Sequence, residues 1–381
     1  MSKFLLIDGN SLTYRAFFAL PTDMTTSSGQ VTNALHGFTM MLATLLRDHQ
    51  PDGLAVAFDR PEKTFRHERL SSYKANREKQ PDILYEQLAL VREIVESLGM
   101  CVVDAKGFEA DDVLATLASL VKDSKEEAII VTGDRDSYQL VEDPHVRVLY
   151  NKRGVSDYAL YDEKGIKERT GVNPKDYVAY AALRGDTSDN LPGVPGVGEK
   201  TAAKLINSYG NLDGVLQAAV DQTPKLRQNL EESEDLVRLN SEMMELVRDV
   251  PLGLTLEELR IKPPDLAKAS ELFDSLELNK SRNLLGPLLG IESWGEGSSG
   301  ESNASDRKQI SIKELVTVDV STLHDMIKAV PKNRNLSVGL GENVEDGIAV
   351  FFGDEPSEAE VFWFPAAVLK NSKINKKLIH L

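Results

Sequence analysis

The chain has 381 residues, 41% of them hydrophobic and 27% charged, which is the composition of a folded protein with room for two or three domains. Its single cysteine excludes an internal disulfide and a zinc site of paired thiolates, and no apolar run is long enough for a secretory signal or a membrane span, so we expect a cytoplasmic protein. The net charge of −16 disfavours a general affinity for phosphate, although basic residues can still be concentrated locally.

In chain order, the first half alternates short apolar runs with segments whose apolar residues have helical spacing. The runs that predict strands are residues 4–7, 54–58, 100–103, 128–132 and 146–149. The segments that predict helices are residues 31–49, 83–98 and 110–121. This alternation predicts that residues 1–171 form an α/β core, in which helices flank a mostly parallel central sheet.

The second half of the chain changes character. Residues 172–290 have a helical pattern interrupted by Gly and Pro, and residues 291–309 have the Gly- and Ser-rich composition of a flexible linker. Residues 310–381 read as a partial α+β domain, with first strands expected at 336–340, 347–352 and 360–364. Too few residues follow to complete a core, so we expect the chain to be a piece of a longer protein.

Acidic residues stand at the ends of three predicted strands of the core. Asp8, Asp59 and Asp134 each follow an apolar run directly or within a residue, and Glu109 and Asp112 lie one helical turn apart at the start of a helix. Aspartate often caps a helix or begins a turn, so each residue alone is weak evidence. Because ligands of parallel sheets bind beyond the carboxyl ends of the strands, we expect these side chains to converge.

Converging carboxylates predict a site for metal ions. Two carboxylates about 6 Å apart repel each other by roughly 3 kcal/mol at an effective dielectric constant of about 20, so several such pairs require protons or bound cations. Oxygen ligands without histidine or cysteine favour Mg²⁺ or Mn²⁺. The pattern suggests two-metal hydrolysis of a phosphodiester, in which one ion activates water and both stabilise the charge of the transition state.

Six motifs make the chain similar to a known family. They read Leu-Leu-Ile-Asp8-Gly-Asn, Phe65-Arg66-His67, Tyr73-Lys74-Ala-Asn-Arg77, Gly107-Phe-Glu109-Ala-Asp111-Asp112, Gly133-Asp134-Arg-Asp136 and Gly185-Asp186-Thr-Ser-Asp189-Asn. In this order, over residues 1–290, they resemble the 5′–3′ exonuclease (flap endonuclease) domain of bacterial DNA polymerase I, which has a PIN-like 5′ nuclease fold.

The resemblance implies which acidic residues bind metal. It assigns to one Mg²⁺ or Mn²⁺ ion the residues Asp8, Asp59, Glu109 and Asp111, and to a second ion Asp134, Asp136, Asp186 and Asp189. Asp112, the ninth matching acid of the metal site, is expected to support these ligands from behind. Every carboxylate that the family pattern requires is present.

The resemblance also implies an arch that guides DNA. Residues 60–79 carry seven basic and three acidic side chains, a local charge of +4, and in the family residues 60–80 arch over the active site so that a single-stranded 5′ flap passes beneath. Lys63 and Arg66 are expected to contact the scissile phosphate as catalytic residues. The further contacts expected with DNA are Tyr14, Arg15, Tyr73, Lys74 and Arg77. For both tyrosines, packing inside the protein is an equally good explanation.

The segment from Gly193 to Thr201 resembles a helix-hairpin-helix loop, which grips the phosphate backbone without reading sequence. Glycines let a backbone approach a phosphate closely, and the segment lacks the spacing of a nucleotide-binding P-loop. The contacts expected here are Gly193, Gly196, Val197, Gly198, Lys200 and Thr201. Family likeness also suggests a K⁺ ion held by carbonyl groups around Val197.

The C-terminal residues 310–381 resemble the beginning of the 3′–5′ exonuclease-like domain that follows in DNA polymerase I. A proofreading domain would carry Asp-x-Glu on its first strand, where this sequence reads Val338-Gly339-Leu340. We therefore expect proofreading to be lost. The parent protein is expected to be a DNA polymerase, although no polymerase motif lies within this chain.

The sequence thus predicts a monomeric, nucleoid-associated nuclease that acts on 5′ flaps, nicks or RNA primers in DNA replication and repair. Two alternatives remain open. One is a non-catalytic DNA-binding module whose carboxylates only cap helices and which needs no divalent metal. The other is a PIN-type ribonuclease with the same acidic core, although such enzymes are usually short and lack the arch and the hairpin.

Overall fold

The computed structural model describes residues 1–154 and 157–294 and, of the later residues, four strands. Residues 1–297 form one compact unit and residues 298–381 a second. In the second unit, the three expected strands are confirmed and a fourth is added, in the order β10 (Leu336–Leu340), β11 (Gly347–Phe352), β12 (Glu360–Pro365) and β9 (Leu315–Thr317). Most of the linker expected at 291–309 lies outside the described residues.

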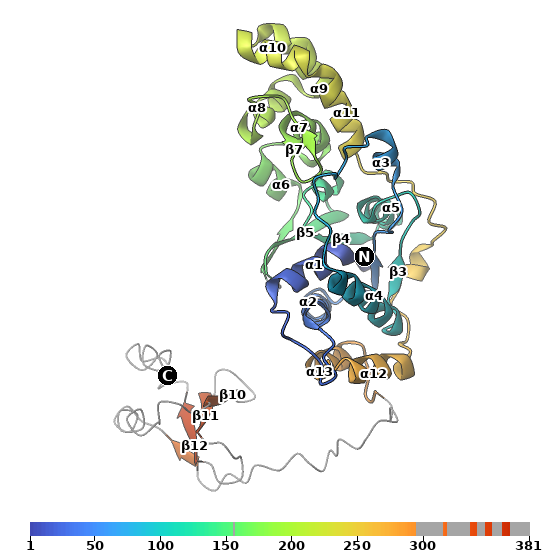
Figure 1. The fold of residues 1–381 in the computed structure, drawn as a ribbon, viewed down its shortest axis with the longest axis vertical. Coiled ribbons are helices and arrows are strands. Elements are labelled where there is room, and N and C mark those ends of the chain that lie inside the picture. Colours follow the sequence, from blue (N-terminus) through green and yellow to red (C-terminus); the bar gives the residue numbers. More distant parts are fainter. Residues whose placement is uncertain (155–156, 295–314, 318–335, 341–346, 353–359, 366–381) are drawn as a thin grey trace. The chain divides into compact units, whose positions relative to one another are not determined.

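The first unit is built on a six-stranded sheet of order β3-β2-β1-β4-β5-β6 (Figure 1). Its strands are β1 (Lys3–Asp8), β2 (Gly53–Ala57), β3 (Cys101–Val103), β4 (Glu127–Thr132), β5 (Val146–Arg153) and β6 (Asp157–Tyr161). The first five strands are parallel, as predicted, and β6 runs antiparallel to β5. None of the residues of β6 is fully buried, and this strand was not predicted from the sequence.

Helices cover both faces of this sheet. Helices α1 (Gly9–Ala19), α2 (Asn33–His49) and α4 (Asp82–Ser97) share a core with Leu5 and Ile7 of β1, whereas α5 (Ala110–Asp123) shares the opposite core with Phe4 and Leu6. Alternate residues of a strand point to opposite faces, and these four side chains are 0% exposed. Each such burial contributes about 1.5–3 kcal/mol, so β1 is held from both sides. The α/β prediction is confirmed.

The remaining helices fall into two groups. One group continues from the core and consists of α6 (Glu163–Thr170), α7 (Tyr177–Arg184), α8 (Glu199–Tyr209), α9 (Leu212–Gln217), α10 (Pro224–Glu232) and α11 (Glu234–Met244). The short elements η2 (Pro174–Asp176), η3 (Ala218–Asp221) and the hairpin of β7 (Gly185–Asp186) with β8 (Leu191–Pro192) join them. Two further short helices lie elsewhere, with η1 (Asp136–Leu140) between β4 and β5 and η4 (Leu256–Leu259) after α11. No helix among the described residues is long and apolar enough to cross a membrane.

The second group, α12 (Leu266–Ser275) and α13 (Asn279–Leu288), returns to the α/β core at the end of the unit opposite to α10 (Figure 1). Phe273 and Leu285 are completely buried in the core of α2 and α4. The hydroxyl groups of Thr39 in α2 and Ser281 in α13 lie 2.7 Å apart. The helical interval 172–290 is therefore divided in space, because its last two helices cover the sheet domain.

Candidate active site

The ends of β1 and β4 meet at Asp8 and Asp134. Asp8 caps α1, since its Oδ1 accepts a hydrogen bond from the Ser11 N–H at 2.8 Å. Its Oδ2 accepts a second from the Thr132 hydroxyl, also at 2.8 Å, and the same hydroxyl oxygen accepts the N–H of Asp134 at 3.0 Å. Thr132 thus ties the two strand ends together. Asp8 therefore both caps α1 and belongs to the acidic cluster.

The start of α5 brings a second group of acids to the same edge. The Asp59 carboxylate beyond β2 accepts a hydrogen bond from the N–H of Ala110 at 2.8 Å, next to Glu109 and Asp111. Glu109 is buried, whereas Asp59 is exposed on the wall of the site. One carboxylate oxygen of Asp111 is buried without any hydrogen-bond partner among the described residues.

The third group of acids lies between β4 and the first residue of η1, and in β7 with the loop that follows it. Asp134 Oδ1 accepts the N–H of Asp136 at 2.8 Å. Asp186 accepts the N–H of Ser188 at 2.7 Å, and Asp189 lies 2.6 Å from a guanidinium nitrogen of Arg77. The structure therefore brings the predicted acids together from five separate segments of the chain.

Crowding of these acids perturbs their protonation. Burial, followed by the charges of Asp59 and Asp134, raises the pKa of Asp8 to about 7. Loss of hydration and then the carboxylates of Asp134, Asp8 and Asp59 raise the pKa of Asp111 well above its ordinary value. Without bound cations, several of these carboxyls therefore hold protons at a pH where isolated ones are ionised.

Glu109 differs from the other acids because cations of the segment 60–80 reach it. Burial favours a higher pKa, but Lys74 and Arg66 outweigh it and hold the pKa of Glu109 below its usual range. The Lys74 ammonium lies 2.8 Å from Glu109 and 3.9 Å from Asp189, and the Tyr73 hydroxyl lies 3.0 Å from both carboxylates. No three acidic, histidine or cysteine side chains in the described part of the chain enclose one point closely enough to hold an ion as they stand.

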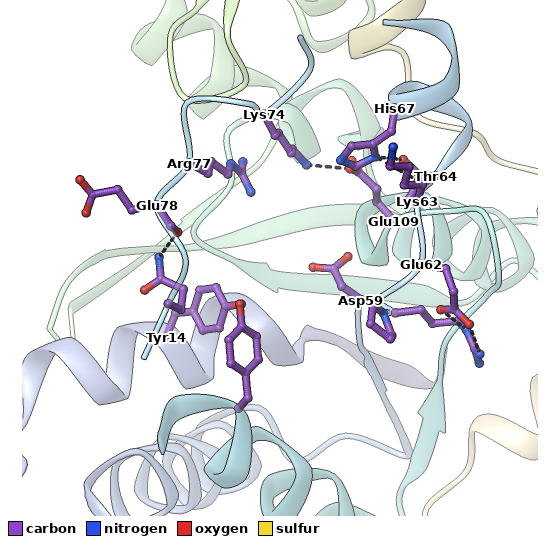
Figure 2. A pocket seen from close by; sticks show the side chains of 14 residues that line it. Tyr14, Asp59, Glu62, Lys63, Thr64, His67, Lys74, Arg77, Glu78 and Glu109 are labelled. Atoms are coloured by element: carbon purple, nitrogen blue, oxygen red, sulfur yellow. Dashed lines mark hydrogen bonds and ion pairs between the residues drawn. The ribbon is translucent and has the colours of Figure 1, made fainter. Parts of the chain in front are cut away.

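A pocket of about 580 Å³ opens beside this cluster, under the segment that contains α3 (Phe65–Arg69). Figure 2 shows Lys74 reaching Glu109 across the pocket, with Asp59 on the wall below. Lys63 is exposed at the rim and makes no ion pair with any described residue. The pocket is lined both by acids of the cluster, Asp59 and Glu109, and by the cations Lys63, Lys74 and Arg77, at a size suited to a nucleotide.

Arg66 does not line this pocket, and the expectation that it contacts the scissile phosphate is corrected. Its side chain is 1% exposed and its guanidinium holds both oxygens of Asp112, at 2.6 and 2.9 Å. It also donates to the carbonyl oxygens of Met243 and Glu245, at 2.7 and 2.9 Å. With its donors engaged inside the protein, Arg66 joins the arch to α5 and to the end of α11. Both carboxylate oxygens of Asp112 are thus held inside the protein at the start of α5.

The tyrosines of the site are of two kinds. Tyr73 is 4% exposed and its ring packs edge-on against His67, with centroids 5.3 Å apart, so it is not open to stack on a base. Tyr14 is half-buried and lines the pocket, together with Tyr85, which is 44% exposed and was not expected from the sequence. Arg15 is half-buried, with its guanidinium beside Gly133.

The predicted hairpin joins α7 to α8 and is held closely. The N–H of Val194 donates to the Leu183 carbonyl at 2.9 Å, and a Cβ on Gly193 would lie 2.2 Å from the Arg184 carbonyl oxygen, so glycine is required there. Residue Asn229 of α10 donates to the Pro195 carbonyl at 2.6 Å. The segment exposes Gly196, Gly198 and Lys200, leaves Thr201 half-exposed and buries the side chain of Val197.

Comparison with protein families identifies this arrangement. Residues 3–171 match the 5′–3′ exonuclease N-terminal resolvase-like domain, and residues 172–267 match the 5′–3′ exonuclease C-terminal SAM fold. The chain belongs to the 5′–3′ exonuclease family. DNA polymerase I of Mycobacterium tuberculosis H37Rv is 44% identical over 297 residues, which are 78% of this chain and 33% of that protein. DNA polymerase I of Bacillus subtilis is 33% identical over 368 residues, which are 94% of this chain and 40% of that protein. The chain thus spans well under half the length of these relatives.

Solved structures share the fold. The 5′-exonuclease of bacteriophage T5 with bound divalent metal ions (zinc) aligns with a TM-score of 0.56 and 20% identity, over 75% of this chain and 99% of that one. The catalytic core of Rad2 in complex with DNA substrate aligns with a TM-score of 0.52 and 19% identity, over 75% of this chain and 92% of that one. These similarities confirm the 5′ nuclease fold for the first unit.

Proposed function

We propose that this member of the 5′–3′ exonuclease family is a metal-dependent 5′–3′ exonuclease and flap endonuclease that hydrolyses phosphodiesters of DNA, or of an RNA primer, near 5′ ends. The observation that carries the proposal is the cluster of acids at the ends of β1, β2 and β4, in which burial and then the charges of the neighbouring acids raise the pKa of Asp8 to about 7. A module whose carboxylates only cap helices has no need for such crowding, and a short PIN-type ribonuclease would lack the hairpin of α7 and α8.

The cluster fits two ions of Mg²⁺ or Mn²⁺ by its chemistry. Every expected ligand offers carboxylate oxygen, and one buried oxygen of Asp111 has no hydrogen-bond partner among the described residues, so that a cation could bind it. We assign one ion to Asp8, Asp59, Glu109 and Asp111, and the other to Asp134, Asp136, Asp186 and Asp189. When bound, such ions activate water and stabilise the charge on the attacking and leaving oxygens.

The residues of the chain would hold the substrate beside this cluster. Lys74 and Arg77, whose charges already lie against Glu109 and Asp189, take the place next to the scissile phosphate that the sequence suggested for Arg66. Exposed Lys63 would bind a phosphate at the rim, and Tyr14 would orient the neighbouring nucleotide. Arg15 remains a candidate contact with DNA.

The hairpin from Gly193 to Thr201 would hold the duplex. Its exposed glycines and Lys200 can approach phosphates, while the Val197 side chain is buried and only its backbone is offered, to DNA or to a K⁺ ion. We further propose that the chain acts as a monomer at the nucleoid, on flaps, nicks and primers. It would be the N-terminal part of a replication and repair DNA polymerase, with residues 310–381 beginning a 3′–5′ exonuclease-like domain that has lost proofreading.

The decisive experiment compares the wild type with Asp134→Ala on a labelled 5′-flap duplex, with and without Mg²⁺. We expect the substitution to lower turnover by at least about 10²–10³-fold and to leave binding of the flap DNA measurable. The matched control is Asp123→Ala, an exposed acid at the far end of α5. Undiminished cleavage by Asp134→Ala, or cleavage by the wild type in EDTA, would refute the metal assignment.

A second substrate distinguishes the proposed function from that of a PIN-type ribonuclease. Single-stranded RNA without any duplex offers nothing for the hairpin to hold, so we expect it to be cut far more slowly than the flap duplex. Faster cleavage of the free RNA would favour the PIN-type ribonuclease.

A further inference from the structure

Glu199, the first residue of α8, is an acid within the hairpin that is proposed to hold DNA. It lies between Gly198 and Lys200, and its side chain is 60% exposed. A carboxylate at this place repels the phosphates that its neighbours would bind. An acid in the first turn of a helix also interacts favourably with the helix dipole, so the position of Glu199 alone has a purely structural explanation.

The contacts of Glu199 go beyond that explanation, because they reach the segments that carry the acidic cluster. One oxygen of its carboxylate lies 3.0 Å from a guanidinium nitrogen of Arg135, the residue between Asp134 and Asp136. The same oxygen lies 4.0 Å from a guanidinium nitrogen of Arg184, the last residue of α7. Two arginines from separate segments therefore share this one carboxylate.

Arg184 continues this connection to a third acid of the cluster. A guanidinium nitrogen of Arg184 lies 3.8 Å from a carboxylate oxygen of Asp186, and its Nε donates to the Gly185 carbonyl oxygen at 3.0 Å. Its guanidinium also lies 5.4 Å from the centre of the Tyr180 ring, and its side chain is only 15% exposed. Glu199 is thus attached to a group that the fold holds in place.

We propose that Glu199 is a positioning residue, which sets the place of the hairpin relative to the acids assigned to the second ion and does not itself bind DNA. This inference rests on the proposed function. A displacement of about 1 Å that arises far from the chemistry can lower a rate by about 100-fold. A link between the segment that holds the duplex and the segments that carry the metal ligands therefore controls turnover more than it controls binding.

The test compares Glu199→Gln with the wild-type chain on a labelled 5′-flap duplex at saturating DNA and Mg²⁺. We expect turnover to fall about ten-fold. The dissociation constant of the flap duplex, measured in EDTA so that the strand stays intact, should be unchanged or lower, because a negative charge beside the phosphates is removed. Glu231→Gln is the matched control, since its half-exposed ion pair with Arg227 at 2.7 Å joins two residues of α10 only, and it should cut as the wild type does.

Two further measurements separate positioning from a purely structural role. Glu199→Gln should unfold at the wild-type temperature, because exposed ion pairs contribute little to stability. If Glu199 acts through Arg135, the double variant Arg135→Gln, Glu199→Gln should turn over no more slowly than Arg135→Gln alone, since residues that act as one unit are not additive. The labelled strand without its complement offers the hairpin no duplex, so Glu199→Gln and the wild type should cut it at the same low rate.

Three results would overturn the inference. One is wild-type turnover by Glu199→Gln on the flap duplex. Another is weaker binding of flap DNA with unchanged turnover, which would make Glu199 a binding residue. The third is a loss of turnover accompanied by a lower unfolding temperature, which would mean that the carboxylate only stabilises α8. If the wild type itself fails to cut the flap duplex in Mg²⁺, the proposed function fails, and that outcome is distinct from all three.

Discussion

Arg66 and Lys63 lie three residues apart, yet the structure gives them opposite surroundings. Arg66→Ala would leave Asp112, which is 0% exposed, as an unpaired buried charge together with two unpaired carbonyl groups. We expect a loss of about 3–5 kcal/mol in the free energy of unfolding, measured by urea denaturation. Arg69→Ala is the control on the same helix, since its ion pair with Glu242 is exposed, and it should stay within about 0.5 kcal/mol.

Lys63→Ala should behave in the opposite way, with unfolding unchanged and binding of flap DNA weakened. Loss of one phosphate contact should also reduce the dependence of the logarithm of affinity on the logarithm of salt concentration by about 1. Binding measured at several salt concentrations checks this. An Arg66→Ala protein that is as stable as the wild type would show that the ion pair between Arg66 and Asp112 does not stabilise the fold.

The contrast between these residues marks how far single residues can be predicted. Asp8, Asp59 and Asp134 were recognisable because each follows an apolar run, and a strand end has a known place in a parallel sheet. Asp111, Asp136, Asp186 and Asp189 were predicted only from the family resemblance. The role of Arg66 was not recognisable, because its partners lie 46 and 177 positions away in the chain. A run of basic residues predicts positive charge near the site. Only the tertiary structure shows which of these residues is buried in an ion pair and therefore cannot contact DNA.

At the scale of the elements, the acid at the end of β1 makes the stability of the fold depend on pH. The folded protein raises the pKa of Asp8 to about 7 from an ordinary 3.8, whereas the unfolded chain releases this proton near the ordinary value. The stabilisation is therefore complete below about pH 4 and is lost as the pH rises to 7, at about 1.4 kcal/mol per pH unit. In EDTA, we expect the free energy of unfolding of the wild type to fall more steeply between pH 5 and pH 7 than that of Asp8→Asn.

Saturating Mg²⁺ should remove most of this decline in the wild type, because a cation replaces the proton as the partner of the carboxylate. The comparison with Asp8→Asn separates the contribution of Asp8 to the pH dependence of stability from the contributions of the histidines and of the other acids. Equal slopes for the two proteins in EDTA would show that Asp8 is not crowded in solution.

The elements themselves were predictable to different degrees. Strands β1 to β5 carry apolar runs and were expected in the correct places, whereas the short run Tyr158–Tyr161 of β6, which is only half-buried or exposed in the structure, was not predicted as a strand. Helices α12 and α13 have clear helical spacing, but spacing does not say which surface a helix covers. Their packing on α2 and α4 depends on contacts between residues more than 200 positions apart, such as Thr39 with Ser281.

At the scale of the whole molecule, the packing of α12 and α13 on α2 and α4 predicts where the chain can be shortened. Residues 1–297 form one compact unit, and Trp294 belongs to it, because its ring lies 5.2 Å from that of Phe273 and under the guanidinium of Arg282. A fragment of residues 1–294 should therefore keep the unfolding temperature of this unit and its cleavage of a 5′-flap duplex.

A fragment that ends at residue 264 should fail, although it retains every predicted ligand and the hairpin. It lacks α12 and α13, whose Phe273 and Leu285 are 0% exposed against α2 and α4. Loss of these two side chains alone costs about 3–6 kcal/mol of burial, a large share of the stability of a typical domain. Calorimetry and flap cleavage of both fragments test this. A stable, active 1–264 fragment would mean that the two helices cover the sheet without supporting it, and an inactive 1–294 fragment would mean that the second unit contributes to the site.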